Sequence, residues 1–273
     1  MIDKNSFSIM RWMLIMIYLG ITIISAFCKS SFIIQISPLI TVLSIFTIVC
    51  LHGTVLYGLK NIIIFFIITW IVSNFFEALS IQTGFPFGFY YYDKLIGPRL
   101  FEVPLIIMFA YFSAGYSSWI LSHVVLEQYN KKPTGTQLIL IPLVAAFIMV
   151  MWDLCMDPLC STVASLWVWN DGGMYFGVPL QNYFGWFLVV YIIYQIFILY
   201  LRKHPVSAIN TNKFFWLEIV AVYGILALTQ LLQFWGAQSH QNIYASMALI
   251  TVFTMLFVTL VSFLRIKESK QLN

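Results

Sequence analysis

The chain has 273 residues, of which 61% are hydrophobic and only 9% are charged, and its mean hydropathy is +0.91. Soluble domains carry roughly 25% charged residues, so this chain has too few to cover a surface that faces water. The net charge of +4 is not arranged as a basic stripe with interleaved aromatic residues, so nucleic acid is not an expected partner. The composition predicts a protein whose solvent is the lipid bilayer.

Long apolar runs follow one another along the chain, and a run of about 20 residues is enough to cross a hydrocarbon core ~30 Å thick. We predict an all-α fold, a polytopic transmembrane helical bundle in which residues 1–273 form a single integral-membrane domain. The predicted spans lie near residues 11–28, 33–53, 58–80, 103–126, 136–156, 183–202, 214–234 and 243–264.

The basic residues predict the orientation of these eight spans, because cytoplasmic loops carry an excess of Lys and Arg. One side of the membrane receives both termini and the even-numbered loops, with Lys4, Arg11, Lys60, Lys131, Lys132, Arg202, Lys203, Lys213, Arg265, Lys267 and Lys270. The other side receives only Lys29, Lys94 and Arg99. We therefore expect a multi-pass protein of the cell membrane with both termini in the cytoplasm.

Six of the ten acidic residues fall in two segments that this topology places at the non-cytoplasmic face. They are Glu77, Asp93 and Glu102 around the third loop, and Asp153, Asp157 and Asp171 around the fifth. An ionised carboxylate at membrane depth costs at least about 2.5–3.5 kcal/mol, so Glu77 is expected to be protonated, paired or in a wet cavity. Glu102 stands before the fourth span, where a negative charge suits the start of a helix.

Asp153 and Asp157 are four residues apart and share one face if the helix continues through them. Pro158 opposes this, because a proline biases the preceding residue away from helical geometry. Two nearby carboxyl groups in a low dielectric titrate in separate steps, so one can act as an acid and the other as a base. The alternative is that these aspartates cap helix ends or bond to Trp169, Tyr175 or Asn182.

The aromatic residues of the same segments allow two interpretations. They could form a belt at the membrane interface, or the wall of a pocket for an apolar substrate. The candidate pocket residues are Phe85, Phe87, Tyr90, Trp152, Trp167, Trp169, Tyr175, Asn182 and Trp186. No cluster of Cys and His has the spacing of a zinc site, and four scattered histidines are too few for a histidine-box iron enzyme, so we expect neither kind of metal site.

Several motifs in the two segments occur together and in order. They are Glu77 with Thr83-Gly-Phe-Pro-Phe-Gly-Phe-Tyr90, Leu95-Ile-Gly-Pro98 before Val103-Pro-Leu105, Trp152-Asp with Met156-Asp-Pro158, Trp167-Val-Trp169, Tyr175-Phe-Gly-Val-Pro-Leu180 and Asn182-Tyr-Phe-Gly-Trp186. Over residues ~70–190 this set resembles the membrane carotenoid hydratases, which include bacterial carotenoid 1,2-hydratases and archaeal bisanhydrobacterioruberin hydratases. Glu102 departs from the pattern, which has a small residue there.

The resemblance implies addition of water to the terminal C1=C2 double bond of an acyclic carotenoid, without a cofactor. Carried over to this sequence, it implies Asp153 as the acid, Glu77 as its partner or as the base for water, and Asp157 as the alternate. Aromatic faces would stabilise the tertiary cation, each by ~0.5–2 kcal/mol. The expected partners are the bilayer and a carotenoid or isoprenoid substrate. The resemblance leaves open whether other carotenoid enzymes are partners as well.

Three other functions fit parts of the sequence. A terpenoid or carotenoid cyclase would use the same protonation and capture the cation internally. An intramembrane prenyltransferase would use Asp153 and Asp157 as a magnesium–pyrophosphate motif, although the second Asp-rich motif is missing. A transporter or a scaffold for pigment enzymes would need no catalytic residues.

Overall fold

Eight helices that are long and apolar enough to cross a membrane dominate the computed structural model, which describes residues 4–28, 30–206 and 211–272. The predicted number of spans is therefore confirmed. The first seven helices are α1 (Lys4–Phe27), α2 (Ser31–Tyr57), α3 (Leu59–Thr83), α4 (Leu105–Val125), α5 (Gln137–Pro158), α6 (Leu180–Lys203) and α7 (Lys213–Gly236). The eighth span joins α8 (Gln241–Thr251) to α9 (Phe257–Glu268) through the π-helical turn η3 (Val252–Leu256).

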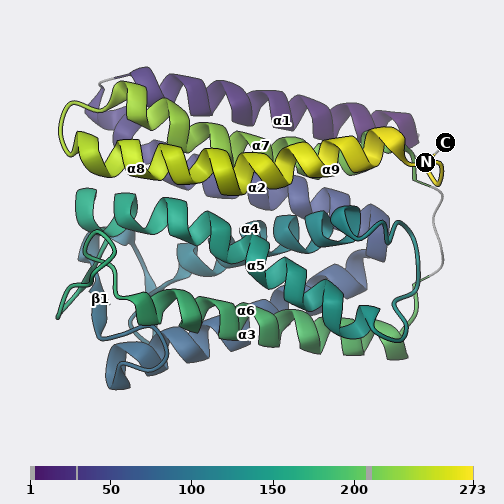
Figure 1. Ribbon diagram of the computed structural model, residues 1–273, viewed down its shortest axis with the longest axis horizontal. Coiled ribbons are helices and arrows are strands. Elements are labelled where there is room, and N and C mark those ends of the chain that lie inside the picture. Colours follow the sequence, from purple (N-terminus) through teal and green to yellow (C-terminus); the bar gives the residue numbers. More distant parts are fainter. Residues whose placement is uncertain (1–3, 29, 207–210, 273) are drawn as a thin grey trace.

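The helices lie side by side along the long axis of the molecule (Figure 1). The start of α1 and the end of α9 lie at one end of the bundle, and strand β1 (Tyr90–Tyr92) lies at the other. Both termini are thus on one side, as an even number of spans requires, while the assignment of that side to the cytoplasm stays a prediction. Lys29, which entered the charge comparison, lies outside the described residues.

Helix α4 forms the centre of the bundle and packs against α2, α3, α5, α7 and α9. Its apolar stretch is the most buried of the eight, at 72%. Ser117 and Ser118 donate to the carbonyl oxygens of Ser113 and Ala114 in the preceding turn, at 2.8 and 2.9 Å. Small residues that satisfy their own hydroxyl groups let neighbouring helices approach closely, which is how helices associate in lipid.

Helix α5 continues through two prolines, each of which leaves the carbonyl four residues earlier without its helical N–H donor. Side chains supply the missing donors. The Gln195 amide donates to the Leu138 carbonyl at 3.2 Å, opposite Pro142, and the Tyr175 hydroxyl donates to the Leu154 carbonyl at 3.0 Å, opposite Pro158. Side chains of neighbouring segments therefore supply hydrogen-bond donors to these backbone carbonyl groups, which lipid cannot do.

The third and fifth predicted spans end too early, at residues 80 and 156. Helix α3 continues to Thr83, and the π-helical turn η2 (Leu159–Val163) extends the fifth span beyond Pro158. The polar residues Gln82 and Thr83 do not end α3, which stops only at Gly84. There the backbone turns left-handed, with a φ of 77°, and the Gly84 N–H donates to the Ser80 carbonyl at 2.8 Å.

Arg11 is also inside a helix rather than flanking it. Its guanidinium contacts the Glu218 carboxylate of α7 with 2.5 Å between Nε and Oε2, and both side chains are buried. The ion pair fixes α1 to α7 at the end of the bundle that holds the termini.

Two short antiparallel sheets add to the all-α prediction, and both lie in the connecting segments. Strand β1 pairs with β4 (Trp167–Trp169), and β2 (Arg99–Leu100) pairs with β3 (Val103–Pro104). Glu102 lies in the turn between β2 and β3 and faces Arg99 at 3.6 Å. The predicted helix cap at Glu102 is wrong, because α4 begins only after the hairpin, at Leu105.

Candidate functional site

Glu77 lies in the last two turns of α3 and accepts hydrogen bonds from three phenol groups. Tyr92 donates to Oε2 at 2.9 Å, Tyr90 donates to the same oxygen, and Tyr111 of α4 donates to Oε1 at 2.6 Å. The carboxylate is 3% exposed. Three donors replace the water that a carboxylate would lose on burial, so the site can hold a negative charge at this depth.

Tyr90 and Tyr92 belong to the loop outside the spans, and both hydroxyl groups keep their protons. Burial first, and then the neighbouring Glu77 carboxylate, raise the pKa of Tyr90 and of Tyr92 well above the usual value of 10.0. A phenol that stays neutral remains a hydrogen-bond donor. The loop therefore presents two permanent donors to Glu77.

The loop after α3 is held close to the bundle by backbone bonds. The Ser80 hydroxyl accepts from the Phe87 N–H at 3.0 Å and donates to the Gly88 carbonyl at 2.9 Å. Gly185 of α6 faces the loop so closely that a Cβ atom there would lie 2.7 Å from the Pro86 carbonyl oxygen. The absence of a side chain at Gly185 lets α6 support the loop that carries Tyr90.

Asp153 and Asp157 lie on one face of α5, and both are buried, with 0% and 2% exposed. The Asn182 amide of α6 donates to Oδ2 of Asp153 at 3.2 Å and to Oδ2 of Asp157 at 2.6 Å. The helix therefore continues through Asp157 despite Pro158, and this is what brings the two aspartates onto one face. Tyr175 makes this possible, because its hydroxyl satisfies the Leu154 carbonyl that Pro158 leaves free.

The β1–β4 sheet joins the glutamate to the aspartate pair. Tyr92 is the partner of Trp167 in the register, and their rings meet edge to face at 5.9 Å. While Tyr92 bonds Glu77, the Trp167 indole N–H donates to Oδ1 of Asp157 at 2.7 Å. Alternate residues of a strand point to one face, so this small sheet bonds two of the three carboxyl groups, those of Glu77 and Asp157.

Two buried polar atoms of this cluster have no hydrogen-bond partner among the described residues. They are Oδ1 of Asp153 and the hydroxyl oxygen of Tyr183. Tyr183 follows Asn182 on α6, and its ring meets that of Tyr175 edge to face at 5.3 Å. Buried polar groups are nearly always bonded, so an unpartnered pair at a carboxylate cluster indicates a place for a ligand or a water.

An aromatic wall lies against the carboxyl groups. The ring of Tyr111 stacks on Trp186 with centroids 4.3 Å apart and an interplanar angle of 5°. Trp152 and Phe87 meet the same Trp186 ring at 6.1 and 6.2 Å. The Trp169 indole donates to the Phe87 carbonyl at 3.0 Å. Such ring faces suit an apolar chain and a developing positive charge.

Four of the predicted residues lie away from this cluster. Phe85 is 52% exposed. The Asp93 carboxylate accepts from the Leu95 N–H at 2.7 Å and caps a short 3₁₀ helix, η1 (Lys94–Ile96). Glu102 and Asp171 are exposed. The structure instead adds Tyr92, Tyr111 and Tyr183. The alternation of Tyr90 with Tyr92 signals the first, while no local pattern marks the other two.

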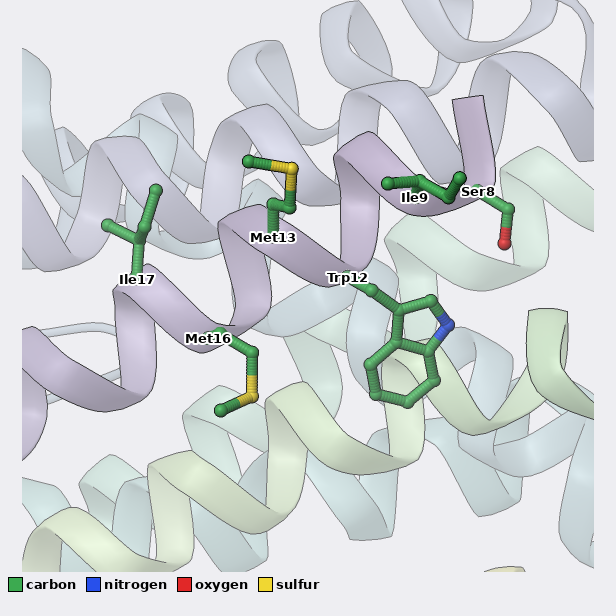
Figure 2. A pocket seen from close by; sticks show the side chains of 6 residues that line it. All are labelled: Ser8, Ile9, Trp12, Met13, Met16 and Ile17. Atoms are coloured by element: carbon green, nitrogen blue, oxygen red, sulfur yellow. The ribbon is translucent and has the colours of Figure 1, made fainter. Parts of the chain in front are cut away.

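A surface hollow along α1 is unrelated to these carboxyl groups. It has a volume of about 490 Å³ and is lined by Ser8, Ile9, Trp12, Met13, Met16 and Ile17 of α1. Figure 2 shows these side chains along a single helix, and none of them carries a carboxyl group. Ile9, Met13, Met16 and Ile17 are more than half exposed, as expected for a helix face in contact with lipid.

Comparisons with known proteins identify a family for this chain. The sequence model of a family described as "Carotenoid biosynthesis protein" matches residues 36–262. A bisanhydrobacterioruberin hydratase of Haloarcula japonica is 29% identical over 113 residues, which are 41% of this chain and 36% of that relative. The matched part thus covers little more than a third of the relative's length. No solved structure matches the chain.

Proposed function

We propose, from the premise that the chain belongs to the carotenoid biosynthesis protein family, that it adds water to the terminal double bond of an acyclic carotenoid. The observation that carries this proposal is the state of the six carboxyl oxygens in the site. Both oxygens of Glu77 and of Asp157 have donors, as does Oδ2 of Asp153, and only Oδ1 of Asp153 has none within the described chain. That oxygen is available to a substrate.

Protonation of an alkene carbon needs a carboxylic acid that is shielded from water. Asp153 is 0% exposed and lies beside a second carboxyl group, an arrangement in which the pair retains one proton between them. In the proposed first step, the Oδ1 proton of Asp153 passes to C2 of the terminal double bond. C1 then becomes a tertiary cation.

The surroundings of Asp153 suit that cation. Glu77, held by three phenol donors, supplies a fixed negative charge, and the stacked Tyr111 and Trp186 rings supply polarisable faces. Preorganised groups of this kind stabilise developing charge without reorganising during the reaction. In the proposed second step water bonds to C1, and its proton returns to the Asp153 carboxylate, which restores the acid.

The substrate is proposed to come from the bilayer, because an acyclic carotenoid is apolar and the bundle has lipid-facing helices on its outside. The site lies near the end of the bundle that carries β1, opposite to the termini (Figure 1). The distribution of Lys and Arg supports a non-cytoplasmic location of that end in the cell membrane. The terminal group of the substrate would then reach the aromatic wall while the polyene stays in lipid.

The test is expression of the chain in a host that makes an acyclic carotenoid, followed by chromatography and mass spectrometry of the pigments. A product heavier by one water is expected. Asp153→Asn and Glu77→Gln should lower its yield by at least about a hundredfold, and the exposed Asp171→Asn should not. An unchanged yield from Asp153→Asn contradicts the assignment. A product of equal mass indicates a cyclase, and unchanged pigments indicate a transporter or scaffold.

A further inference from the structure

The hydroxyl of Tyr183 takes no part in the hydrogen bonds between the described residues of the site. Tyr90, Tyr92 and Tyr111 bond Glu77, and Tyr175 bonds the Leu154 carbonyl. Tyr183 has the remaining phenol at this cluster, and its oxygen is buried without a partner in the described part of the chain. A buried hydroxyl that supports no other residue is free to serve a ligand.

Two neighbours, Asn182 and Tyr175, connect Tyr183 to the aspartate pair. It follows Asn182, whose amide bonds both aspartates, and its ring packs edge to face on Tyr175. The Tyr175 hydroxyl in turn reaches the backbone of Leu154, the residue after Asp153.

The two unpartnered atoms have complementary chemistry. The Tyr183 hydroxyl is a donor, and Oδ1 of Asp153 becomes an acceptor once its proton has left. A water that bridged the two atoms would accept from the phenol with one lone pair and donate a proton to the carboxylate. Its second lone pair would stay free for a carbon.

We propose that Tyr183 binds and orients the water that captures the tertiary cation, which rests on the hydratase function proposed above. The C2–H bond forms with the proton of Asp153. The C1–O bond forms with the free lone pair of the water, and the broken O–H bond returns its proton to the Asp153 carboxylate. The sum is addition of one water, with no other reactant.

This role separates cation formation from cation capture, and the two steps are measured separately in D₂O. Reversible protonation by Asp153 introduces deuterium at C2 of recovered substrate, whereas capture gives the alcohol. Purified protein in lipid nanodiscs is incubated with an acyclic carotenoid in D₂O, and both pools are analysed by mass spectrometry. Tyr183→Phe keeps the ring and its packing on Tyr175.

Tyr183→Phe is expected to lower hydration by about tenfold or more while deuterium in recovered substrate stays equal or rises. Tyr200→Phe is the matched control, because Tyr200 lies on the same helix and its hydroxyl donates to Asn61 at 2.8 Å, outside the site. It should hydrate as the wild type does.

The proposal is overturned if Tyr183→Phe hydrates the substrate at the wild-type rate. It is also overturned if Tyr183→Phe loses deuterium exchange and hydration to the same extent while it unfolds at the wild-type temperature. Tyr183→His gives a second result if the first variant accumulates poorly. The imidazole keeps a hydrogen-bond donor, so the ratio of hydration to deuterium exchange should stay near that of the wild type. A large fall in that ratio also overturns the proposal. A wild-type protein that neither hydrates nor exchanges refutes the hydratase function itself, and this inference with it.

Discussion

The Tyr175 hydroxyl donates to the Leu154 carbonyl at 3.0 Å, and this carbonyl is the one that Pro158 leaves without a helical donor. A residue of the loop between the fifth and sixth spans thereby lets α5 pass through a proline. The consequence is functional, since Asp153 and Asp157 stay one helical turn apart and share the Asn182 amide.

Tyr175→Phe should therefore destabilise the protein by about 1–3 kcal/mol, the cost of a buried carbonyl without a donor. The measurement is the free energy of unfolding in detergent. Pro158→Ala restores an N–H at position 158, so the double variant should recover much of that loss. A double variant no more stable than Tyr175→Phe alone would contradict this account of the helix.

Tyr111→Phe removes one of the three donors to Glu77 but leaves the ring stacked on Trp186. A hydrogen bond to a charged group contributes about 1.5–3 kcal/mol, so we expect the hydration rate to fall about tenfold or more. Tyr223→Phe is the control, because its buried hydroxyl donates to the Ile148 carbonyl, at 2.9 Å, and not to Glu77. Equal rates in the two variants would show that Glu77 does not depend on Tyr111.

Gly185→Ala should displace the loop that carries Tyr90, because the new Cβ would meet the Pro86 carbonyl oxygen at 2.7 Å and a Phe87 ring atom at 2.8 Å. Overpacking of this kind costs about 1–3 kcal/mol, and hydration should fall with it. Gly20→Ala in α1 has no atom within 4 Å of the added Cβ. It should be neutral, or stabilise by about 0.5–1 kcal/mol, with full activity.

Removing one partner of the Arg11–Glu218 pair leaves an uncompensated buried charge and should cost about 3–5 kcal/mol. Arg11→Met and Glu218→Gln test this in thermal unfolding. Replacing both residues by Met should be close to neutral, because no unpaired charge is then left buried. The pair lies at the end of the bundle opposite to β1 (Figure 1), so hydration per folded molecule should not change in any of the three variants.

Alkaline pH should destabilise the folded protein through Tyr92. Burial raises the pKa of Tyr92 well above 10.0, whereas in the unfolded chain it is about 10. The folded state then binds more protons than the unfolded state above pH ~10, so stability is constant below that pH and falls above it, by up to about 1.4 kcal/mol per pH unit for one group. Unfolding measured across this range should show a shallower fall for Tyr92→Phe than for the wild type.

The sequence by itself predicts the eight spans, the even number that places both termini on one side, and the two acidic aromatic segments. Each of these depends on local composition, because a run of apolar residues prefers lipid wherever it packs. The residues Glu77, Asp153, Asp157 and Asn182 are also recognisable locally, since polar groups in apolar spans are costly and therefore few.

Only the tertiary structure decides what those polar groups bond. Tyr111 is 34 residues from Glu77, and Trp167 faces Tyr92 through a pairing of strands that are separated by two helices. A tyrosine within a span has the same sequence pattern whether its ring packs in the core or its hydroxyl donates to a carboxylate, because the local sequence does not indicate the partner of the hydroxyl. Pro158 predicts a break in the helix, yet α5 continues because Tyr175, distant in sequence, supplies the missing donor. Hydropathy acts along one segment at a time, whereas a buried polar group is satisfied by whichever segment the packing of the bundle places beside it.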